Sequence, residues 1–215
     1  VHFLLDVRGF LYLNQLKGNY IEFGSYMSEM QYAAYHILEP TGIMKRYVGL
    51  DTFEGEPEAE GAELVAMPVT KESDFSCDFK RIQQFVKRYL GKKGVLIRGD
   101  FRNQAVLEAC HPYAPFNVAV VDCNILSSLE ASIRYSLTHL IDGGVLFVDD
   151  YLSNFGQGVP RVPNMLRQLA TECNRRLYRH GFYAPFAQSF IVCSSRDMQE
   201  SKPGLANKAI DGDEE

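Results

Sequence analysis

Six acidic residues stand at or near the ends of short apolar runs, where carboxylates could bind a cofactor or a metal ion. They are Glu22, Asp51, Asp100, Asp122 and the adjacent pair Asp149 and Asp150. If these runs are parallel strands of an open sheet, their carboxyl ends meet at one edge, where such sheets bind ligands. A single aspartate at a strand end is more often a helix cap or a loop hydrogen-bonder. The shared edge makes a functional site the better interpretation.

The first two runs indicate the kind of cofactor. Gly24 follows the first run, and Asp51 ends the second, where its carboxylate could accept hydrogen bonds from the ribose hydroxyls of an adenosine cofactor. The turn after Gly24 lacks the G-x-G-x-x-G pattern that lets a backbone approach a pyrophosphate. Glu29, in the first turn of the next predicted helix, would repel a phosphate. We therefore expect a phosphate-free cofactor with a cationic end.

The last two runs indicate a metal ion. Asp122, Asp149 and Asp150 end neighbouring predicted strands, and their oxygen atoms suit a hard cation such as Mg²⁺ better than zinc. Cys123 lies beside Asp122, but no histidine is near it in the sequence. We interpret Cys123 as a small buried residue rather than a nucleophile.

The elements that would position these residues alternate between strand-like runs and helical patterns, which is typical of βαβ units. We expect strands at 20–24, 46–50, 95–97, 118–121 and 145–148, and a hairpin within 182–194. Helices are expected over 28–39, 76–90, 104–110, 127–142 and 163–179. The sequence thus predicts an α/β fold with a Rossmann-like, doubly wound, mostly parallel seven-stranded sheet and an antiparallel C-terminal edge hairpin.

Three of the expected helix starts depend on local signals. Ser28 and Gln31 have the spacing of a capping box, and so do Ser127 and Glu130. Pro163 is expected at the first position of the last helix, where its missing N–H costs nothing. Few residues precede the first predicted strand, so we expect the elements before it to be short or absent.

The length and composition predict one globular domain. A chain of 215 residues can bury a sizeable core, and we assign the domain to 1–195. Hydrophobic residues make up 46% and charged residues 23%, as in ordinary soluble proteins. The segment 196–215 is polar and ends in acidic residues, so we expect a flexible tail. The acidic stretch 54–63 is expected to be a solvated loop.

Charge and cysteine usage disfavour several partners and sites. A net charge of -5 disfavours nucleic acid as a partner, and no apolar run approaches the roughly 20 residues of a membrane span. The five cysteines show no CxxC or Cys/His ligand spacing, which argues against a disulfide framework and a zinc site. No secretory signal is visible. We expect a cytoplasmic protein acting on a small molecule, with a homodimer left open.

Four segments of the chain stand out together: YIEFG at 20–24, GLDTFEG at 49–55, VDCN at 121–124 and GGVLFVDDY at 143–151. In order and spacing they resemble the macrocin O-methyltransferase family of class I S-adenosylmethionine-dependent methyltransferases. The resemblance spans about 20–194 and implies a Rossmann-like enzyme. It implies methyl transfer from S-adenosylmethionine to hydroxyl groups of sugars or aromatic rings on natural products, with Mg²⁺ held by aspartates.

The resemblance also implies roles for individual residues in cofactor binding. Glu22 and Gly24 would contact the methionine part of S-adenosylmethionine, Asp51 the ribose and Asp100 the adenine region. The family usually has a Gly-Gly pair at the position where this chain has Ser28 and its neighbour, so Ser28 stands in the predicted cofactor loop.

Metal binding and catalysis are implied for the remaining carboxylates. Asp122, Asp149 and Asp150 would hold Mg²⁺, and Asp122 could also take the proton from the substrate hydroxyl. The family's second carboxylate after the fourth strand is here an amide, Asn124. Two other functions stay open at this point: a cofactor-binding protein of the same fold without catalysis, and an NAD(P)-dependent oxidoreductase.

Overall fold

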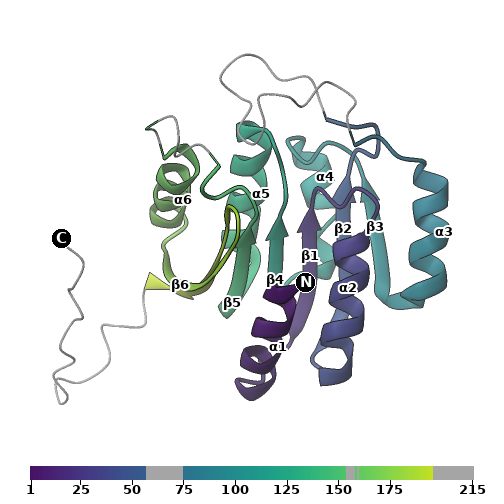
Figure 1. Cartoon of the computed structure of the whole chain (residues 1–215), viewed down its shortest axis with the longest axis horizontal. Coiled ribbons are helices and arrows are strands. Elements are labelled where there is room, and N and C mark those ends of the chain that lie inside the picture. Colours follow the sequence, from purple (N-terminus) through teal and green to yellow (C-terminus); the bar gives the residue numbers. More distant parts are fainter. Residues whose placement is uncertain (57–74, 154–157, 159, 196–215) are drawn as a thin grey trace, which may run out of the picture.

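The computed structural model describes residues 1–56, 75–153, 158 and 160–195 and contains one seven-stranded sheet (Figure 1). The strands are β1 (Gly18–Phe23), β2 (Met44–Asp51), β3 (Gly94–Arg98), β4 (Phe116–Val121), β5 (Leu140–Val148), β6 (Arg175–Tyr183) and β7 (Ala187–Ser194). Their order is β3-β2-β1-β4-β5-β7-β6. Strands β1 to β5 are parallel, and β7 runs antiparallel to both neighbours. The predicted Rossmann-like sheet with its C-terminal edge hairpin is confirmed.

Helices cover both faces of the sheet. They are α1 (His2–Leu13), α2 (Glu29–Leu38), α3 (Phe79–Tyr89), α4 (Gln104–Glu108), α5 (Leu126–His139) and α6 (Arg161–Glu172), with short 3-10 turns at Glu39–Thr41, Gly91–Lys93 and His111–Tyr113. Side chains of α1, α2 and α3 share one core cluster, and those of α4, α5 and α6 share another. No helix in the described ranges is long and apolar enough to cross a membrane.

Side chains of strand β1 pack into both core clusters. Its side chains alternate between the faces, so Tyr20 packs in the α1–α3 cluster while Ile21 and Phe23 pack in the α4–α6 cluster. All six residues of β1 and all six of β4 are buried, as expected of central parallel strands covered on both sides.

The strand register brings the predicted acidic residues to one edge. Phe23 pairs with Leu50 on one side and with Val121 on the other, and Val121 pairs with Val148. The residues that follow these strand ends therefore lie side by side at the carboxyl edge of the sheet; they are Gly24, Asp51, Asp122 and Asp149.

Both predicted capping boxes are wrong. Ser28 precedes α2 but has a left-handed backbone (φ 60°) and makes no side-chain cap bond. Gln31 is fully buried and donates instead to the carbonyl oxygens of Tyr47 (2.8 Å) and Val95 (3.0 Å). Helix α5 begins one residue before Ser127, so Ser127 and Glu130 lie inside it. Tertiary bonding to the sheet outweighs the local capping pattern at α2.

Two predicted helices end earlier than expected. Leu140 and Ile141 belong to β5, because Leu140 pairs with Phe116 of β4. Helix α6 begins at Arg161, so Pro163 is its third residue rather than its first, and it ends at Glu172. Asn174 then takes a left-handed conformation (φ 54°), a common way to end a helix, and the segment expected to continue the helix forms β6.

Other boundaries shift by a few residues. Helix α3 starts at Phe79 with Asp78 as its N-cap, three residues later than predicted. The residues before β1 form the helix α1, where little structure was expected. Most of the acidic stretch 54–63 and the whole predicted tail 196–215 lie outside the described residues.

Candidate active site

Two adjoining cavities lie at the carboxyl edge of the sheet. The inner cavity, of about 60 Å³, is lined by Asp51, Asp100, Asp122 and Asn124 among others. The outer cavity, of about 380 Å³, extends from Asp51 and Asp122 to Asp149, Asp150 and the turn between β6 and β7. The cavities share Gly24, Asp51, Glu56, Phe75, Asp122 and Asn124. They therefore form one cleft that crosses the ends of β2, β1, β4 and β5.

Gly24 allows the ends of β1 and β4 to approach closely. Its φ is +82°, and a Cβ atom there would lie 1.9 Å from the carbonyl oxygen of Asp122. Because any side chain would collide with this backbone oxygen and strain the left-handed backbone, only glycine fits here. The predicted position of Gly24 beside the site is thus explained by backbone contact.

Asp51 is fixed by two backbone donors. Its Oδ2 accepts from the N–H of Tyr26 (2.8 Å), and its Oδ1 accepts from the N–H of Phe53 (2.7 Å). Both residues have positive φ, 42° for Tyr26 and 59° for Phe53, so the carboxylate stabilises two strained turns. Burial raises the pKa of Asp51, and the backbone bonds partly offset this rise. Asp51 also lines both cavities.

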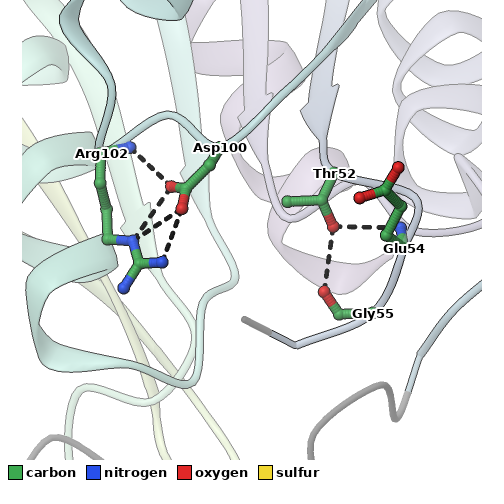
Figure 2. A network of polar contacts seen from close by, with 5 residues as sticks. All are labelled: Thr52, Glu54, Gly55, Asp100 and Arg102. Carbon is green, nitrogen blue, oxygen red and sulfur yellow. Dashed lines mark hydrogen bonds and ion pairs between the residues drawn. The ribbon is translucent and has the colours of Figure 1, made fainter. Parts of the chain in front are cut away.

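Asp100 is engaged by its neighbour Arg102. Figure 2 shows the carboxylate turned toward the guanidinium and away from the turn of Thr52 and Gly55. Its Oδ2 accepts from the Arg102 Nη2 at 2.6 Å and from the Arg102 Nε at 2.9 Å. Burial alone would raise the pKa of Asp100, but the hydrogen bonds and charge of Arg102 outweigh it and lower the pKa. Asp100 lines the inner cavity as part of an ion pair.

Three carboxylates, those of Asp122, Asp149 and Asp150, lie at the ends of β4 and β5, and the positive N-terminal amino group lowers the pKa of Asp149 without outweighing its burial. Asp122 is open to the cleft but surrounded by protein atoms; this burial, followed by the charges of Asp149 and Asp150, raises its pKa to about 7. Burial and the charge of Asp149 raise the pKa of Asp150 to about 6, and burial raises that of Asp149. Mutual repulsion of this kind is what a bound cation would relieve.

These carboxylates match Mg²⁺ in chemistry but do not close around a common point. The oxygen donors are those that a hard cation prefers. Among the described residues, however, no group of three His, Cys, Asp or Glu side chains is arranged so that it could hold a metal ion. A metal at this edge would therefore require the three side chains to turn toward one another.

Glu22 and Ser28 line neither cavity. Glu22 is 2% exposed, and its Oε2 accepts from the Tyr20 hydroxyl at 2.7 Å. Burial raises the pKa of Glu22 well above its ordinary value, and the charge of Asp122 adds to this effect. Ser28 is fully buried. The structure places both residues behind the cleft surface rather than on it.

Aromatic residues that were not singled out from the sequence form the walls of the outer cavity. Tyr26 and Phe75 meet edge to face with ring centroids 5.6 Å apart. Phe186 lies in the β6–β7 turn, where its carbonyl oxygen accepts from the N–H of Leu152 (3.0 Å). Because β7 is antiparallel to β5, this turn returns to the carboxyl edge. Only the strand order, not a local motif, could have predicted this position.

Comparison with known proteins supports the fold. The sequence matches no protein-family model and no curated protein. The chain is similar to the calicheamicin methyltransferase CalS11 at 17% identity, over 88% of this chain and 78% of that one, with a TM-score of 0.64. It is similar to the O-methyltransferase NovP at 12% identity, over 90% and 78%, with a TM-score of 0.68.

A third similar structure is the MycE methyltransferase from the mycinamycin biosynthetic pathway, solved in complex with Mg and SAH. The identity is 13%, the alignment covers 95% of this chain and 51% of that one, and the TM-score is 0.53. At these identities the similarity shows the fold alone. The chain has the class I methyltransferase form of the Rossmann-like fold.

Proposed function

We propose that the protein transfers the methyl group of S-adenosylmethionine to a hydroxyl group of a small molecule. The observation that carries this proposal is the single cleft that joins Asp51, a carboxylate held by two backbone N–H groups, to Asp122, a carboxylate whose pKa is raised by burial and by neighbouring carboxylates. The similarity to O-methyltransferases supports it. Two of the similar structures are named for calicheamicin and mycinamycin, so a sugar or aromatic ring of a natural product is the acceptor type that we propose.

The charge of the cleft suits a sulfonium cofactor. Carboxylates of Asp51, Glu56, Asp122, Asp149 and Asp150 line the outer cavity, and they would attract the positive sulfur and repel a pyrophosphate. Asp51 would bind the ribose, with Asp100 on the adenine side and Gly24 near the methionine part. The inner cavity is smaller than an adenosine, and the Asn124 side chain donates to Glu56 there, so cofactor entry requires these side chains to move.

Asp122 would act as the general base. In the transfer step the S–CH₃ bond breaks as the O–CH₃ bond forms, and the hydroxyl proton passes to Asp122. Without a bound metal ion, burial and the charges of Asp149 and Asp150 raise the pKa of Asp122 to about 7, which suits a base near neutral pH. Asp122, Asp149 and Asp150 would hold Mg²⁺, which when bound supplies positive charge that lowers the pKa of the hydroxyl. The cleft would also accelerate the reaction by aligning the methyl group of the cofactor with the acceptor hydroxyl.

Calorimetric titration with S-adenosylhomocysteine, combined with methyl transfer from labelled S-adenosylmethionine to a panel of phenols and sugars, tests this function. We expect the wild-type protein to bind the cofactor and the Asp122→Asn variant to bind it but transfer no methyl group. Asp78→Asn, a change at the cap of α3, is the control and should retain both properties. Absence of cofactor binding, or full transfer by Asp122→Asn, would refute the proposal.

A further inference from the structure

The outer cavity combines an acidic floor with aromatic walls. Asp122, Asp149 and Asp150 form the floor, and the rings of Tyr26, Phe75 and Phe186 border it. Phe75 is 46% exposed and Phe186 is 43% exposed, although both are large apolar side chains. A volume of about 380 Å³ lies in the range of sites for small ring compounds. This is the part of the cleft that would receive the methyl acceptor.

The cavity has a strong excess of negative charge. It is lined by five carboxylates, and no Lys, Arg or His is found among its described lining residues. S-adenosylmethionine carries one net positive charge. With this cofactor bound and Asp122 protonated, the remaining lining carboxylates still outnumber the positive charges, even when the N-terminal amino group that acts on Asp149 is counted. An acceptor with a phosphate or carboxylate group would be repelled there, whereas a cationic acceptor would be attracted.

Asp150 marks the place where a cation would be bound. The residue is 9% exposed and borders the outer cavity. No described residue donates a hydrogen bond to its carboxylate; the charges that act on it, those of Asp149 and Glu56, are both negative. Because Asp150 borders the cavity and its carboxylate neighbours are negative, a positively charged group of a ligand would be favoured at this position.

The walls suit the same kind of ligand. Aromatic faces attract cations and also stack on flat rings, so Tyr26, Phe75 and Phe186 would hold a ring that carries a positive charge. We propose, on the basis of the proposed methyltransferase function, that the acceptor is a hydroxyl-bearing ring compound with a protonated amine. Its hydroxyl lies at Asp122 and its ammonium group at Asp150, between the aromatic side chains of the outer cavity, which leaves Asp122 and Asp149 to hold Mg²⁺.

Two matched sets of probes test this proposal. The phenols are tyramine, 4-ethylphenol and 3-(4-hydroxyphenyl)propionate, which are cationic, neutral and anionic. The sugars are methyl glucosaminide, methyl glucoside and methyl glucuronide, in the same order of charge. Binding is measured by NMR titration of the protein saturated with S-adenosylhomocysteine, in EDTA and again with Mg²⁺. The stronger set shows whether the ring is aromatic or a sugar.

We expect the cationic member of the stronger set to bind about tenfold or more tightly than the anionic member, with the neutral member between them. Asp150→Asn should remove most of this difference. Glu54→Gln, which removes an exposed charge outside the cavity, is the matched control and should preserve it. If Asp150→Asn is poorly folded, Phe186→Leu replaces it and should weaken tyramine binding about twofold to fivefold more than 4-ethylphenol binding.

Several results would overturn the proposal. Equal or tighter binding of the anionic probe would do so, as would failure of every probe to bind up to millimolar concentrations. Loss of the cation preference on adding Mg²⁺ would assign the carboxylates to the metal instead of the acceptor. Persistence of the preference with Mg²⁺ supports the proposal. Binding of S-adenosylhomocysteine is recorded in the same samples. Its loss would contradict the proposed methyltransferase function and not the proposed charge of the acceptor.

Discussion

Replacement of Asp51 by alanine tests the cofactor site most directly. The substitution removes the acceptor that we propose for the ribose hydroxyls and the acceptor of two backbone N–H groups, those of Tyr26 and Phe53. Both of these residues have positive φ, so the turns on either side of the cleft lose a restraint as well. Binding and stability should therefore fall together, and the two effects have to be separated.

The expected magnitudes follow from these bonds. A charged acceptor for sugar hydroxyls contributes more than a neutral one, and its loss should weaken binding of S-adenosylhomocysteine by about 1.5 to 3 kcal/mol. This corresponds to a dissociation constant about 10- to 150-fold higher. The unpaired N–H groups of Tyr26 and Phe53 should lower the free energy of unfolding by about 1 to 3 kcal/mol each if water does not reach them.

Asp78→Ala provides a matched control. The Asp78 carboxylate also accepts two backbone N–H groups, those of Lys80 and Arg81, but it caps α3 away from the cleft. Its loss should destabilise the protein by about 1 kcal/mol and leave cofactor affinity unchanged. Urea unfolding measures stability, and calorimetry below the unfolding transition measures affinity. Unchanged affinity in Asp51→Ala, or an equal loss in Asp78→Ala, would show that Asp51 is not a cofactor ligand.

The remaining predictions concern charge. NADH should not bind at concentrations that saturate the protein with S-adenosylhomocysteine, because the cleft repels a pyrophosphate; tight NADH binding in competition assays would contradict this. Since burial raises the pKa of Glu22, ionised Glu22 destabilises the fold, and its contribution disappears as the pH falls. Glu22→Gln should therefore raise the urea midpoint at about pH 8 and change it little at about pH 4. Asp149→Asn, or EDTA, should abolish methyl transfer but leave cofactor affinity nearly intact; wild-type rates in both would exclude the metal. Binding of S-adenosylmethionine should release more protons near pH 7 than binding of S-adenosylhomocysteine, because only the sulfonium lowers the pKa of Asp122. Calorimetry in buffers of different ionisation enthalpy measures this, and equal release would place the sulfonium elsewhere.

Much of the fold could be predicted because the central strands have strong apolar patterns. The runs at 118–121 and 145–148 lie within β4 and β5, and the alternation with helices fixed the parallel arrangement. The errors occur where a helical pattern runs into a strand. Leu140 continues the apolar stripe of α5 but pairs with Phe116, a long-range partner that no local pattern reveals. Asn174 ends α6 before β6, earlier than the predicted helix end at residue 179.

Some residues of the site could also be placed from the sequence, and others could not. Asp51, Asp122 and Asp149 could be placed because Asp51 is the last residue of β2 and the other two directly follow β4 and β5. Glu22 lies one residue before the end of β1, so its side chain points to a face of the sheet, as that of Tyr20 does, rather than to the edge. Phe186 could not be placed, since its position depends on the antiparallel return of β7.

Basic and acidic residues gather at opposite edges of the sheet, and this separation bears on the cofactor, the base and the acceptor that we propose. At the amino ends of the strands, a cavity of about 610 Å³ is lined by Lys17, Lys45, Arg46 and Lys93. At the carboxyl ends, the outer cavity is lined by carboxylates alone among its charged described residues. A net charge of -5 is thus unevenly distributed. Such a field favours the approach of cations at the carboxyl edge and of anions at the opposite edge. Because the carboxylates repel one another, a positive ligand stabilises the protein where it binds, and a sulfonium cofactor and a protonated acceptor meet that requirement at the same edge.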